Sequence, residues 1–341
     1  MKRPTIADIA ERAGVSKGAV SYALNGQPGV SDATRQRIVA IAREIGFNPN
    51  RAARALSGAR AEAVGLTLCR PAKILGIEPF FMGLISGFET ELAKRGYAFT
   101  LQLTQSPEQE SEVHRRWWGE RRVDGVFVTD LRADDTRIPV LQKLQLPAVV
   151  IGGPGDTGTI PQIWSDDAGA VAEAVRYLAA LGHRRIARIS GLPAFLHTQV
   201  RTRAFTQVCA TLGFEAAVTV PADYTGEEGG RATRRLLMAD DRPTAVIYDN
   251  DVMAVAGLAV AQEMGLRVPA DLSIVAWDDS PLCRLVHPAL TALTRDISAY
   301  AAHAARRLLA TIDGDDGTHA ESAPARLTPR GSTAPPPLTA A

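Results

Sequence analysis

The feature that most constrains this chain is a pair of short helical patterns near its start, separated by a very tight turn. Thr5 followed three residues later by Asp8 is the pattern of a capping box, and Gly14 is a typical helix end. Ser16 can cap a second helix immediately afterwards, and that helix ends near Asn25. Two short helices joined in this way predict a helix-turn-helix motif.

A third helical pattern begins at Ser31 and ends at Gly46. Its inward positions recur at helical spacing: Ile38, Ile41, Ala42 and Ile45. Its expected outward positions carry arginines: Arg35, Arg37 and Arg43. Three helices of this kind can bury one small core, so the segment is expected to fold as a head of its own.

Positive charge is concentrated in the same segment. Residues 1–60 contain ten Lys/Arg and four Asp/Glu, a net charge of +6, whereas the remainder has a net charge of −5. The near-neutral total therefore consists of a basic head and an acidic body. Such asymmetry favours a nucleic-acid partner for the head, because neutralising phosphates releases counterions and supplies most non-specific affinity.

The segment resembles the amino-terminal head and hinge of the lactose-repressor (LacI/GalR) family of bacterial transcription regulators, through the runs TIADIAERAGVSKGAVSYALNG and PGVSDATRQRIVAIAREIGFNPNRAARALS. The resemblance covers nearly the whole chain. It implies a sequence-specific transcription regulator, with repression as the expected action, that binds a pseudo-palindromic operator in double-stranded DNA. The regulator is expected to be a homodimer, with a tetramer left open, and to respond to a small effector.

The resemblance implies two sets of DNA contacts in the head. Base reading falls on the second helix, at Lys17, Gly18 and Tyr22. Lysine donates to guanine acceptors and tyrosine offers a hydroxyl or ring, whereas Gly18 offers no side chain and costs about 1 kcal/mol of helix propensity. Contacts to the DNA backbone, or capping roles, are implied for Thr5, Ser16, Ser21, Asn25, Arg51 and Arg54.

Pro49 separates the third helix from a short segment, Asn50–Ser57, that is too short to form a stable helix alone. In the family, the matching segments of two subunits pair in the minor groove, where a leucine wedges open a base step. The resemblance assigns that leucine to Leu56. The alternative is a simple linker helix with one exposed leucine.

Length and composition fit a cytoplasmic protein with further domains. A head of about 60 residues leaves about 280 of the 341, enough for two more lobes of ordinary size. Cys69, Cys209 and Cys283 are odd in number and far apart, which disfavours a disulfide framework. No apolar run approaches the length of a membrane span, and no export signal is visible, so we expect no membrane partner.

From Ala63 onward, strand and helix patterns alternate in two series. The expected strands are Val64–Cys69, Ala98–Leu103, Gly125–Thr129 and Ala148–Ile151, then Ile186–Ser190, Ala216–Val220, Thr244–Tyr248 and Ser273–Trp277. Alternation of this kind predicts parallel sheets covered on both faces, with a cleft at the carboxyl ends of the strands. Together with the resemblance, it indicates an all-α helix-turn-helix head and hinge helix, followed by an α/β periplasmic-binding-protein-like core of two doubly wound lobes.

The expected domain boundaries follow from these patterns. The head covers residues 1–47, the hinge and linker 48–60, and the core 61–333. Within the core, the N-lobe is expected at about 61–163 and 293–321, and the C-lobe at about 164–292 and 322–333. The chain would therefore cross between the lobes three times. Asp313–Ala323 is expected to be a polar loop, and residues 334–341 a disordered tail.

Effector-binding residues are implied by the resemblance where the family pattern matches: Arg201, Tyr224, Asn250, Asp278, Phe80 and His197. An arginine can fork onto hydroxyls or a carboxylate, and an aromatic ring gives a sugar a surface to stack on. The resemblance therefore implies a sugar or glycoside as the effector, and these residues are compatible with one.

Each of these positions has an alternative structural role. Asn250 can cap the following helix, and Asp278 can orient a loop. Phe80 can belong to the core, His197 to the surface, and Arg201 to an ion pair between lobes.

Three departures from the family pattern leave the effector open. The stretch Arg70–Glu78 is longer than usual, Glu78 stands where Asn is common, and Asp249 replaces a small residue.

The alternative to a transcription regulator is a cytosolic protein that binds small molecules, or a nucleotide-dependent enzyme. In either case the head would bind DNA without sequence specificity. Gly153–Gly158 satisfies G-x-G-x-x-G, but no helix pattern follows to hold a pyrophosphate, which favours a simple turn. No nucleophile elbow or zinc motif is present in the sequence, so neither a catalytic residue, a metal nor a cofactor is expected. A solute-binding protein for a transporter would have no use for the head.

Overall fold

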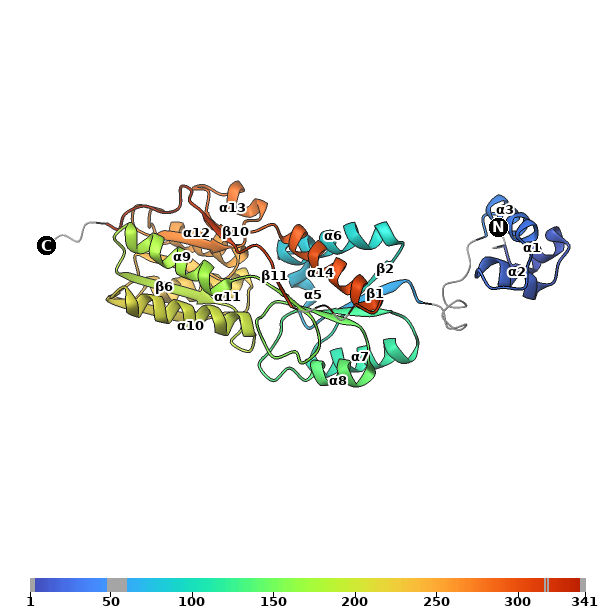
Figure 1. Ribbon diagram of the computed structural model, residues 1–341. Coiled ribbons are helices and arrows are strands. Elements are labelled where there is room, and N and C mark those ends of the chain that lie inside the picture. Colours follow the sequence, from blue (N-terminus) through green and yellow to red (C-terminus); the bar gives the residue numbers. More distant parts are fainter. Residues whose placement is uncertain (1–3, 48–59, 316, 318, 338–341) are drawn as a thin grey trace. The chain divides into compact units, whose positions relative to one another are not determined.

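The computed structural model describes residues 4–47, 60–315, 317 and 319–337 (Figure 1). Contacts divide the chain after Ala61 into a small amino-terminal head and a larger core. The predicted hinge segment Asn50–Ser57, with Arg51, Arg54 and Leu56, lies outside the described residues.

The head is formed by three helices, as predicted: α1 (Ile6–Ala13), α2 (Lys17–Leu24) and α3 (Asp32–Glu44). Thr5 and Asp8 form the expected capping box, and the side chains of Ser16 and Ser31 cap α2 and α3. Gly14 ends α1 in the left-handed region, at a φ of 65°. The buried core is Ile9, Ala10, Ala13, Val20, Ala23, Ile38 and Ala42. The helix-turn-helix prediction is confirmed.

Arg35 does not point outward as predicted. Its guanidinium donates to the backbone carbonyls of Tyr22 (3.3 Å), Ala23 (2.8 Å) and Gln27 (2.7 Å). These carbonyls lie at the end of α2, where helical hydrogen-bonding partners run out. Arg35 therefore holds the end of α2 against α3. Helical periodicity in the sequence cannot distinguish an arginine with this role from one that is exposed to solvent.

The N-lobe of the core is built on a six-stranded parallel sheet in the order β11-β5-β4-β3-β1-β2. Its strands are β1 (Ala63–Leu68), β2 (Ala98–Leu103), β3 (Gly125–Val128), β4 (Ala148–Ile151), β5 (Gln162–Trp164) and β11 (Ala320–Glu321). Its helices are α5 (Ala72–Leu75), α6 (Pro79–Leu92) with a 3₁₀ turn at Ala93–Arg95, α7 (Pro107–Gly119), α8 (Arg137–Leu144) and α14 (Ile297–Ile312).

Helices cover both faces of this sheet. Helices α6 and α14 pack on one face and α7 and α8 on the other, so β1, β3 and β4 are buried along their whole length (Figure 1). The contact between α6 and α14 requires Gly87, because a Cβ there would lie 2.2 Å from the carbonyl oxygen of Ser298.

The C-lobe repeats the plan with the order β12-β10-β9-β8-β6-β7, in which only β12 runs antiparallel to its neighbour among the described pairings. Its strands are β6 (Arg185–Ser190), β7 (Ala216–Pro221), β8 (Ala245–Tyr248), β9 (Ser273–Trp277), β10 (Thr291–Thr294) and β12 (Arg326–Thr328). Its helices are α9 (Asp167–Ala180), α10 (Leu196–Thr211), α11 (Gly226–Leu237), α12 (Asp251–Glu263) and α13 (Pro281–Leu285).

Three segments connect the lobes, as expected: β5 to α9, β10 to α14, and β11 to β12. The eight strands predicted between Val64 and Trp277 are present, with ends shifted by at most one residue. The short elements α5, β5, β10, α13 and β11 were not predicted.

Two predictions near the end of the chain are wrong in part, within the residues that the structure describes. The predicted polar loop Asp313–Ala323 contains β11, which adds an edge strand beside β5. The tail predicted to be disordered from Ala334 is held at its first residue: the Ala334 amide donates to Ser273 Oγ at 3.1 Å, and its carbonyl lies 3.0 Å from His183 Nε2. Backbone pairing stabilises Ala320–Glu321, and tertiary hydrogen bonds hold Ala334, whereas composition alone reveals neither contact.

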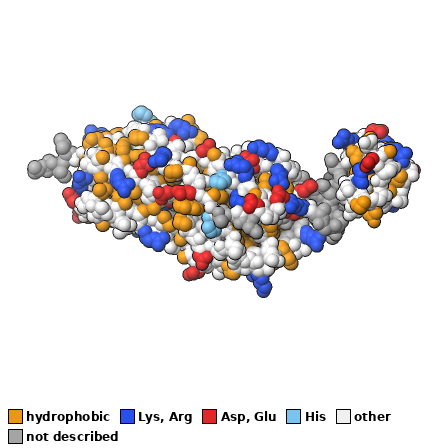
Figure 2. Space-filling view, in the orientation of Figure 1, with side chains coloured by type: hydrophobic (Ala, Val, Ile, Leu, Met, Phe, Trp, Pro, Cys, Tyr) orange, Lys and Arg blue, Asp and Glu red, His pale blue; other side chains and the backbone are white. Residues whose placement is uncertain are grey.

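The surface of the core carries both signs of charge. On the face shown in Figure 2, basic and acidic side chains are interspersed over both lobes. Within the described residues, no helix is both long and apolar enough to cross a membrane.

Candidate functional site

One face of α2 is free of the packing inside the head. Val20 and Ala23 are buried, whereas Lys17, Gly18 and Tyr22 are exposed, with 49% of Tyr22 accessible. The three positions predicted to read bases therefore lie together on a face that contributes nothing to the core of the head.

The other head residues predicted to meet DNA have local partners. The hydroxyls of Thr5 and Ser16 accept from the backbone amides of Asp8 (3.4 Å) and Ala19 (3.1 Å). Asn25 Nδ2 donates to Ser21 Oγ at 3.4 Å. These side chains stabilise helix ends, and a residue of this kind can also contact phosphate without reading sequence.

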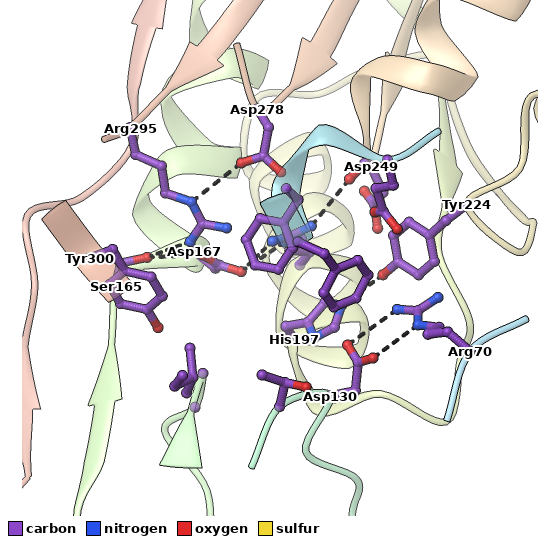
Figure 3. Close-up of a pocket in the computed structure, with 18 residues that line it drawn as sticks. Arg70, Asp130, Ser165, Asp167, His197, Tyr224, Asp249, Asp278, Arg295 and Tyr300 are labelled. Atoms are coloured by element: carbon purple, nitrogen blue, oxygen red, sulfur yellow. Dashed lines mark hydrogen bonds and ion pairs between the residues drawn. The ribbon is translucent and has the colours of Figure 1, made fainter. Parts of the chain in front are cut away.

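A cavity of about 70 Å³ lies between the two lobes of the core (Figure 3). From the N-lobe it is lined by Arg70, Glu78, Phe80, Phe81, Thr129, Asp130, Ile151, Gly152, Gly153 and Tyr300. From the C-lobe and the connecting segments it is lined by Ser165, Asp167, His197, Arg201, Tyr224, Asp249, Asp278 and Arg295. Many of these residues directly follow the carboxyl ends of strands, where doubly wound sheets bind ligands.

Three cavity residues other than glycine adopt the left-handed backbone region that favours glycine. The φ angles are 53° for Asp130, 70° for Tyr224 and 62° for Asp278. Such conformations cost on the order of 1–3 kcal/mol each and persist where the surroundings hold them. Their concentration around one cavity indicates that the positions of these side chains are constrained by the fold.

Ion pairs neutralise most of the carboxylates around the cavity. Arg70 forks onto Asp130 at 2.9 and 3.2 Å, and Arg201 contacts Asp167 at 2.8 Å. Burial alone raises the pKa of Asp167, but Arg201 and then Arg295 outweigh burial and lower it. Burial also raises the pKa of Asp130, but the neighbouring Arg70 outweighs burial, so the pKa of Asp130 is lowered.

Two further pairs complete the set. Arg295 Nε donates to Asp278 Oδ1 at 3.3 Å. Arg188 lies behind the cavity and forks onto Asp249 at 2.7 and 2.5 Å, with neither side chain exposed. Asp249, the departure from a small residue noted in the sequence, is therefore the partner of a buried arginine.

The same arginines stack on aromatic rings across the cleft. The Arg70 guanidinium lies 4.7 Å from the ring centre of Phe195 and 4.8 Å from that of Tyr224, both in the C-lobe. Arg295 lies 5.5 Å from the ring centre of Phe80, in the first turn of α6 of the N-lobe. Each arginine therefore links the lobes through a cation–π contact.

Tyr224 and His197 form a polar pair in the C-lobe wall (Figure 3). The Tyr224 hydroxyl lies 2.7 Å from His197 Nε2 and 3.0 Å from Thr198 Oγ1. Burial, followed by the charge of Arg201, lowers the pKa of His197 to about 4, so this imidazole is neutral at pH 7. His197 lines the cavity and does not lie on the open surface.

Asn250 acts as a helix cap, the alternative considered for it. Its Oδ1 accepts from the Met253 amide at 2.9 Å, and its Nδ2 donates to the Tyr224 carbonyl at 2.9 Å. The same Nδ2 lies 3.5 Å from Glu78 Oε1 across the cleft. Asn250 is absent from the cavity lining, whereas the other five predicted effector residues are part of it.

Glu78 differs from the other cavity acids because no arginine pairs with it at ion-pair distance among the described residues. Its Oε2 is buried and has no hydrogen-bond partner. Burial raises the pKa of Glu78 to about 7, while Arg70 opposes that rise.

The glycine-rich run considered for the enzyme alternative is followed by a strand, β5, and not by a helix. Gly153–Gly158 makes a turn before β5, and Gln162 holds it by accepting from the Gly155 amide at 3.1 Å and donating to the Gly155 carbonyl at 2.5 Å. No cluster of three His, Cys, Asp or Glu side chains suited to a metal occurs among the described residues.

Comparison with known proteins gives the family. Residues 5–50 match the family described as bacterial regulatory proteins, lacI family, and residues 175–333 match the periplasmic binding protein-like domain. The HTH-type transcriptional regulator CelR of Thermobifida fusca is 31% identical over 318 residues, which cover 92% of this chain and 93% of CelR. The chain belongs to the LacI family of bacterial regulatory proteins. It is therefore a helix-turn-helix transcription regulator, and the family is not one of enzymes.

Solved structures agree with this LacI-family assignment. A CelR–cellobiose complex is 29% identical, with a TM-score of 0.74, and covers 97% of this chain and 100% of that one. The lac repressor dimer bound to operator and the anti-inducer ONPF is 25% identical, with a TM-score of 0.85, and covers 98% of this chain and 100% of that one. The two-lobed α/β core predicted for this LacI-family regulator is confirmed.

Sequence reasoning missed several of the regulator's cavity residues, among them Asp130, Asp167, Arg295 and Tyr300. Asp130 and Asp167 each follow a strand within a few residues, and that position was a usable signal. Arg295 and Tyr300 lie in the second connection between lobes, where the sequence offers no pattern that places them near Arg201.

Proposed function

We propose that this regulator binds a pseudo-palindromic operator as a homodimer and that a small sugar in the interlobe cleft controls the binding. The observation that best supports this proposal is the cavity at the carboxyl ends of both sheets. In its lining, paired arginines and carboxylates lie among aromatic rings. Planar polar groups hydrogen bond to sugar hydroxyls, and rings pack on the apolar faces of sugars. A protein acting on bacterial DNA works in the cytoplasm.

The head is proposed to read DNA through α2. Lys17 and Tyr22 would contact base edges in the major groove, and Gly18 between them would let the helix approach closely. Thr5, Ser16, Ser21 and Asn25 would contact the DNA backbone.

The segment at residues 48–60 is proposed as the hinge between head and core. Arg51 and Arg54 would contact the DNA backbone there, and Leu56 would act as the minor-groove wedge. Pairing of two such segments on DNA would require a dimer.

The proposed effector class has support from relatives. One similar structure is a complex of the regulator CelR with cellobiose, and another LacI-family regulator, from Enterococcus faecium, is 25% identical and holds bound ribose. In this chain, Arg201, Tyr224, Asp278, Phe80 and His197 line the cavity and would meet the sugar directly. Asn250 would act by holding Tyr224 and the start of α12.

Control would operate through the angle between the lobes. Arg70, Arg295 and Asn250 contact the opposite lobe or its aromatic rings, so a sugar that displaces these contacts changes how the lobes close. The change would alter whether two hinge segments can pair on DNA. Because coupling is reciprocal, a sugar that weakens operator binding must bind the DNA complex less tightly by the same factor.

A binding selection on genomic fragments tests the proposal. Purified full-length protein is mixed with the fragments at two salt concentrations, and the retained DNA is sequenced. We expect enrichment of a pseudo-palindrome. Salt-sensitive retention without a shared motif would reduce the head to a non-specific binder and overturn operator recognition.

A further inference from the structure

A second hollow in the core is lined by the C-lobe alone and shares no residue with the cavity between the lobes. This C-lobe groove has a volume of about 480 Å³, which lies within the usual range for small-molecule sites. Its walls are the first turns of α10, the connection before that helix, and the ends of β6 and β7. The lining residues are Ser190, Pro193, Thr198, Gln199, Thr202, Arg203, Thr219 and Pro221.

Most polar side chains of the C-lobe groove already have partners inside the protein. Ser190 Oγ and Gln199 Nε2 donate to backbone carbonyls at 3.1 and 3.0 Å, and Thr202 Oγ1 donates to another at 2.7 Å. Arg203 and Thr219 differ, because neither side chain has a hydrogen bond or ion pair with any residue that the structure describes. Arg203 comes from α10 and Thr219 from β7, so both walls of the groove offer a polar group to a bound molecule.

The two available groups favour a particular ligand chemistry. Arg203 carries the only charge in the lining, which attracts an anion and disfavours a cation. Its guanidinium donates in a planar fork that matches a carboxylate, and the Thr219 hydroxyl can donate as well. One cation balances one negative charge, so a carboxylate suits the groove better than a doubly charged phosphate. Pro193 and Pro221 offer apolar surface to the rest of such a molecule.

Helix α10 separates the C-lobe groove from the cavity between the lobes (Figure 1). His197 and Arg201 on this helix line the cavity, whereas Thr198 and Thr202 line the groove. A molecule in the groove would therefore contact the reverse side of the helix that forms part of the cavity wall.

Two hydrogen bonds connect the groove residues to the cavity wall. Thr198 Oγ1 lies 3.0 Å from the Tyr224 hydroxyl, whose ring lines the cavity. Thr202 Oγ1 accepts from Arg188 Nη1 at 2.8 Å, and Arg188 in turn holds Asp249. A ligand that shifts the start of α10 would move these contacts, so ligands in the groove and in the cavity should affect one another reciprocally.

We propose that the C-lobe groove is a second ligand site, which binds the carboxylate of a small organic acid through Arg203 and Thr219. The site does not depend on the sugar proposed for the cleft, because the two linings have no residue in common. An organic acid bound there acts on the regulator through α10, in addition to the effector.

The experiment measures binding by calorimetry with the full-length protein, without DNA or sugar. The probes are lactate, benzoate and phenylacetate, each paired with its neutral amide, and inorganic phosphate. Arg203→Gln removes the charge, and Thr219→Phe fills the groove from the edge strand. Arg176→Gln is the matched control, because Arg176 is an exposed arginine on α9 of the same lobe and lies outside both linings. Circular dichroism checks that each variant is folded.

We expect at least one of the carboxylates to bind the wild type. Its affinity should fall at least tenfold in Arg203→Gln and in Thr219→Phe and stay within twofold in Arg176→Gln, and the matching amide should bind the wild type at least tenfold more weakly. If no carboxylate binds, or if Arg203→Gln binds it as tightly as the wild type, the proposed site is overturned.

Two further outcomes refute parts of the proposal. Tighter binding of inorganic phosphate than of every carboxylate would overturn the assignment of an organic acid. If a carboxylate binds through Arg203 but leaves the affinity for DNA from the operator selection unchanged at saturation, the site stands and its coupling through α10 fails. Failure of the DNA selection itself would concern the head and leaves the calorimetric result unaffected.

Discussion

Replacing Glu78 with Gln should stabilise the folded core, and the gain should grow with pH. Burial is the largest cause that raises the pKa of Glu78 from 4.5 to about 7; Arg70 and Asn250 oppose the rise, while Asp130 and Asp278 add to it. Between these two pH values the folded state holds a proton that the unfolded state has released. By linkage, the stability of the wild type therefore declines as pH rises through this window.

The rise in pKa sets the size of the effect. From 4.5 to about 7, at 1.36 kcal/mol per pKa unit, the cost of ionising Glu78 in the folded state reaches about 3 kcal/mol. Below about pH 4.5 the carboxyl is protonated in both states and the cost disappears. Glutamine does not ionise, so the difference in unfolding free energy between variant and wild type should increase by about 3 kcal/mol from pH 4.5 to pH 8.

Urea unfolding followed by tryptophan fluorescence measures this difference. All four tryptophans lie in the core: Trp117, Trp118, Trp164 and Trp277. Circular dichroism should give coincident transitions, which would justify a single free energy for the core. Glu112→Gln, at an exposed position on α7, is the control and should show no comparable pH trend. A difference between Glu78→Gln and wild type that stays constant across pH would refute the reasoning.

Other predictions concern buried charge, the head and coupling. Asp249→Asn leaves Arg188 buried beside a neutral amide and should cost about 3–5 kcal/mol in the same unfolding assay, whereas replacing both residues with apolar ones should recover most of the loss. Arg35→Ala should destabilise the end of α2 by about 1–3 kcal/mol, measured as faster amide exchange of that helix in the full-length chain. Tyr22→Ala should change which bases the DNA selection enriches, and an unchanged motif would show that Tyr22 reads none of them. A sugar that weakens operator binding should bind the operator complex more weakly by an equal factor, and equal affinity with and without operator contradicts control by that sugar.

Local patterns carried most of the information about the fold. A helix cap such as Thr5 with Asp8 involves residues only three positions apart, and the periodicity of a strand or helix appears within a few more residues. Both patterns can therefore be recognised in a sequence. Elements of two to five residues, such as β11 and α13, offer too few positions for a period to appear. Their existence depends on pairing with segments far away along the chain.

The site was predictable only where the family pattern could be carried over. Arg201 lines the cavity, but its partner Asp167 is 34 residues away and belongs to another helix. The pair Arg188–Asp249 spans 61 residues. A sequence pattern does not specify which arginine pairs with which acid. The charge balance of the cavity can therefore be determined only from the three-dimensional structure.

The two sides of the cleft should differ in how freely they can change. On the C-lobe side, Arg201 and the Arg188–Asp249 pair are joined to buried partners, so a substitution there alters folding as well as ligand contact. On the N-lobe side, Glu78 and Thr129 each have a buried atom with no partner, so removing that atom breaks no hydrogen bond. A change at these positions should then cost little stability, or even increase it. Substitutions at Glu78 and Thr129 should therefore cost less folding stability than substitutions that break the Arg188–Asp249 or Arg201–Asp167 pair.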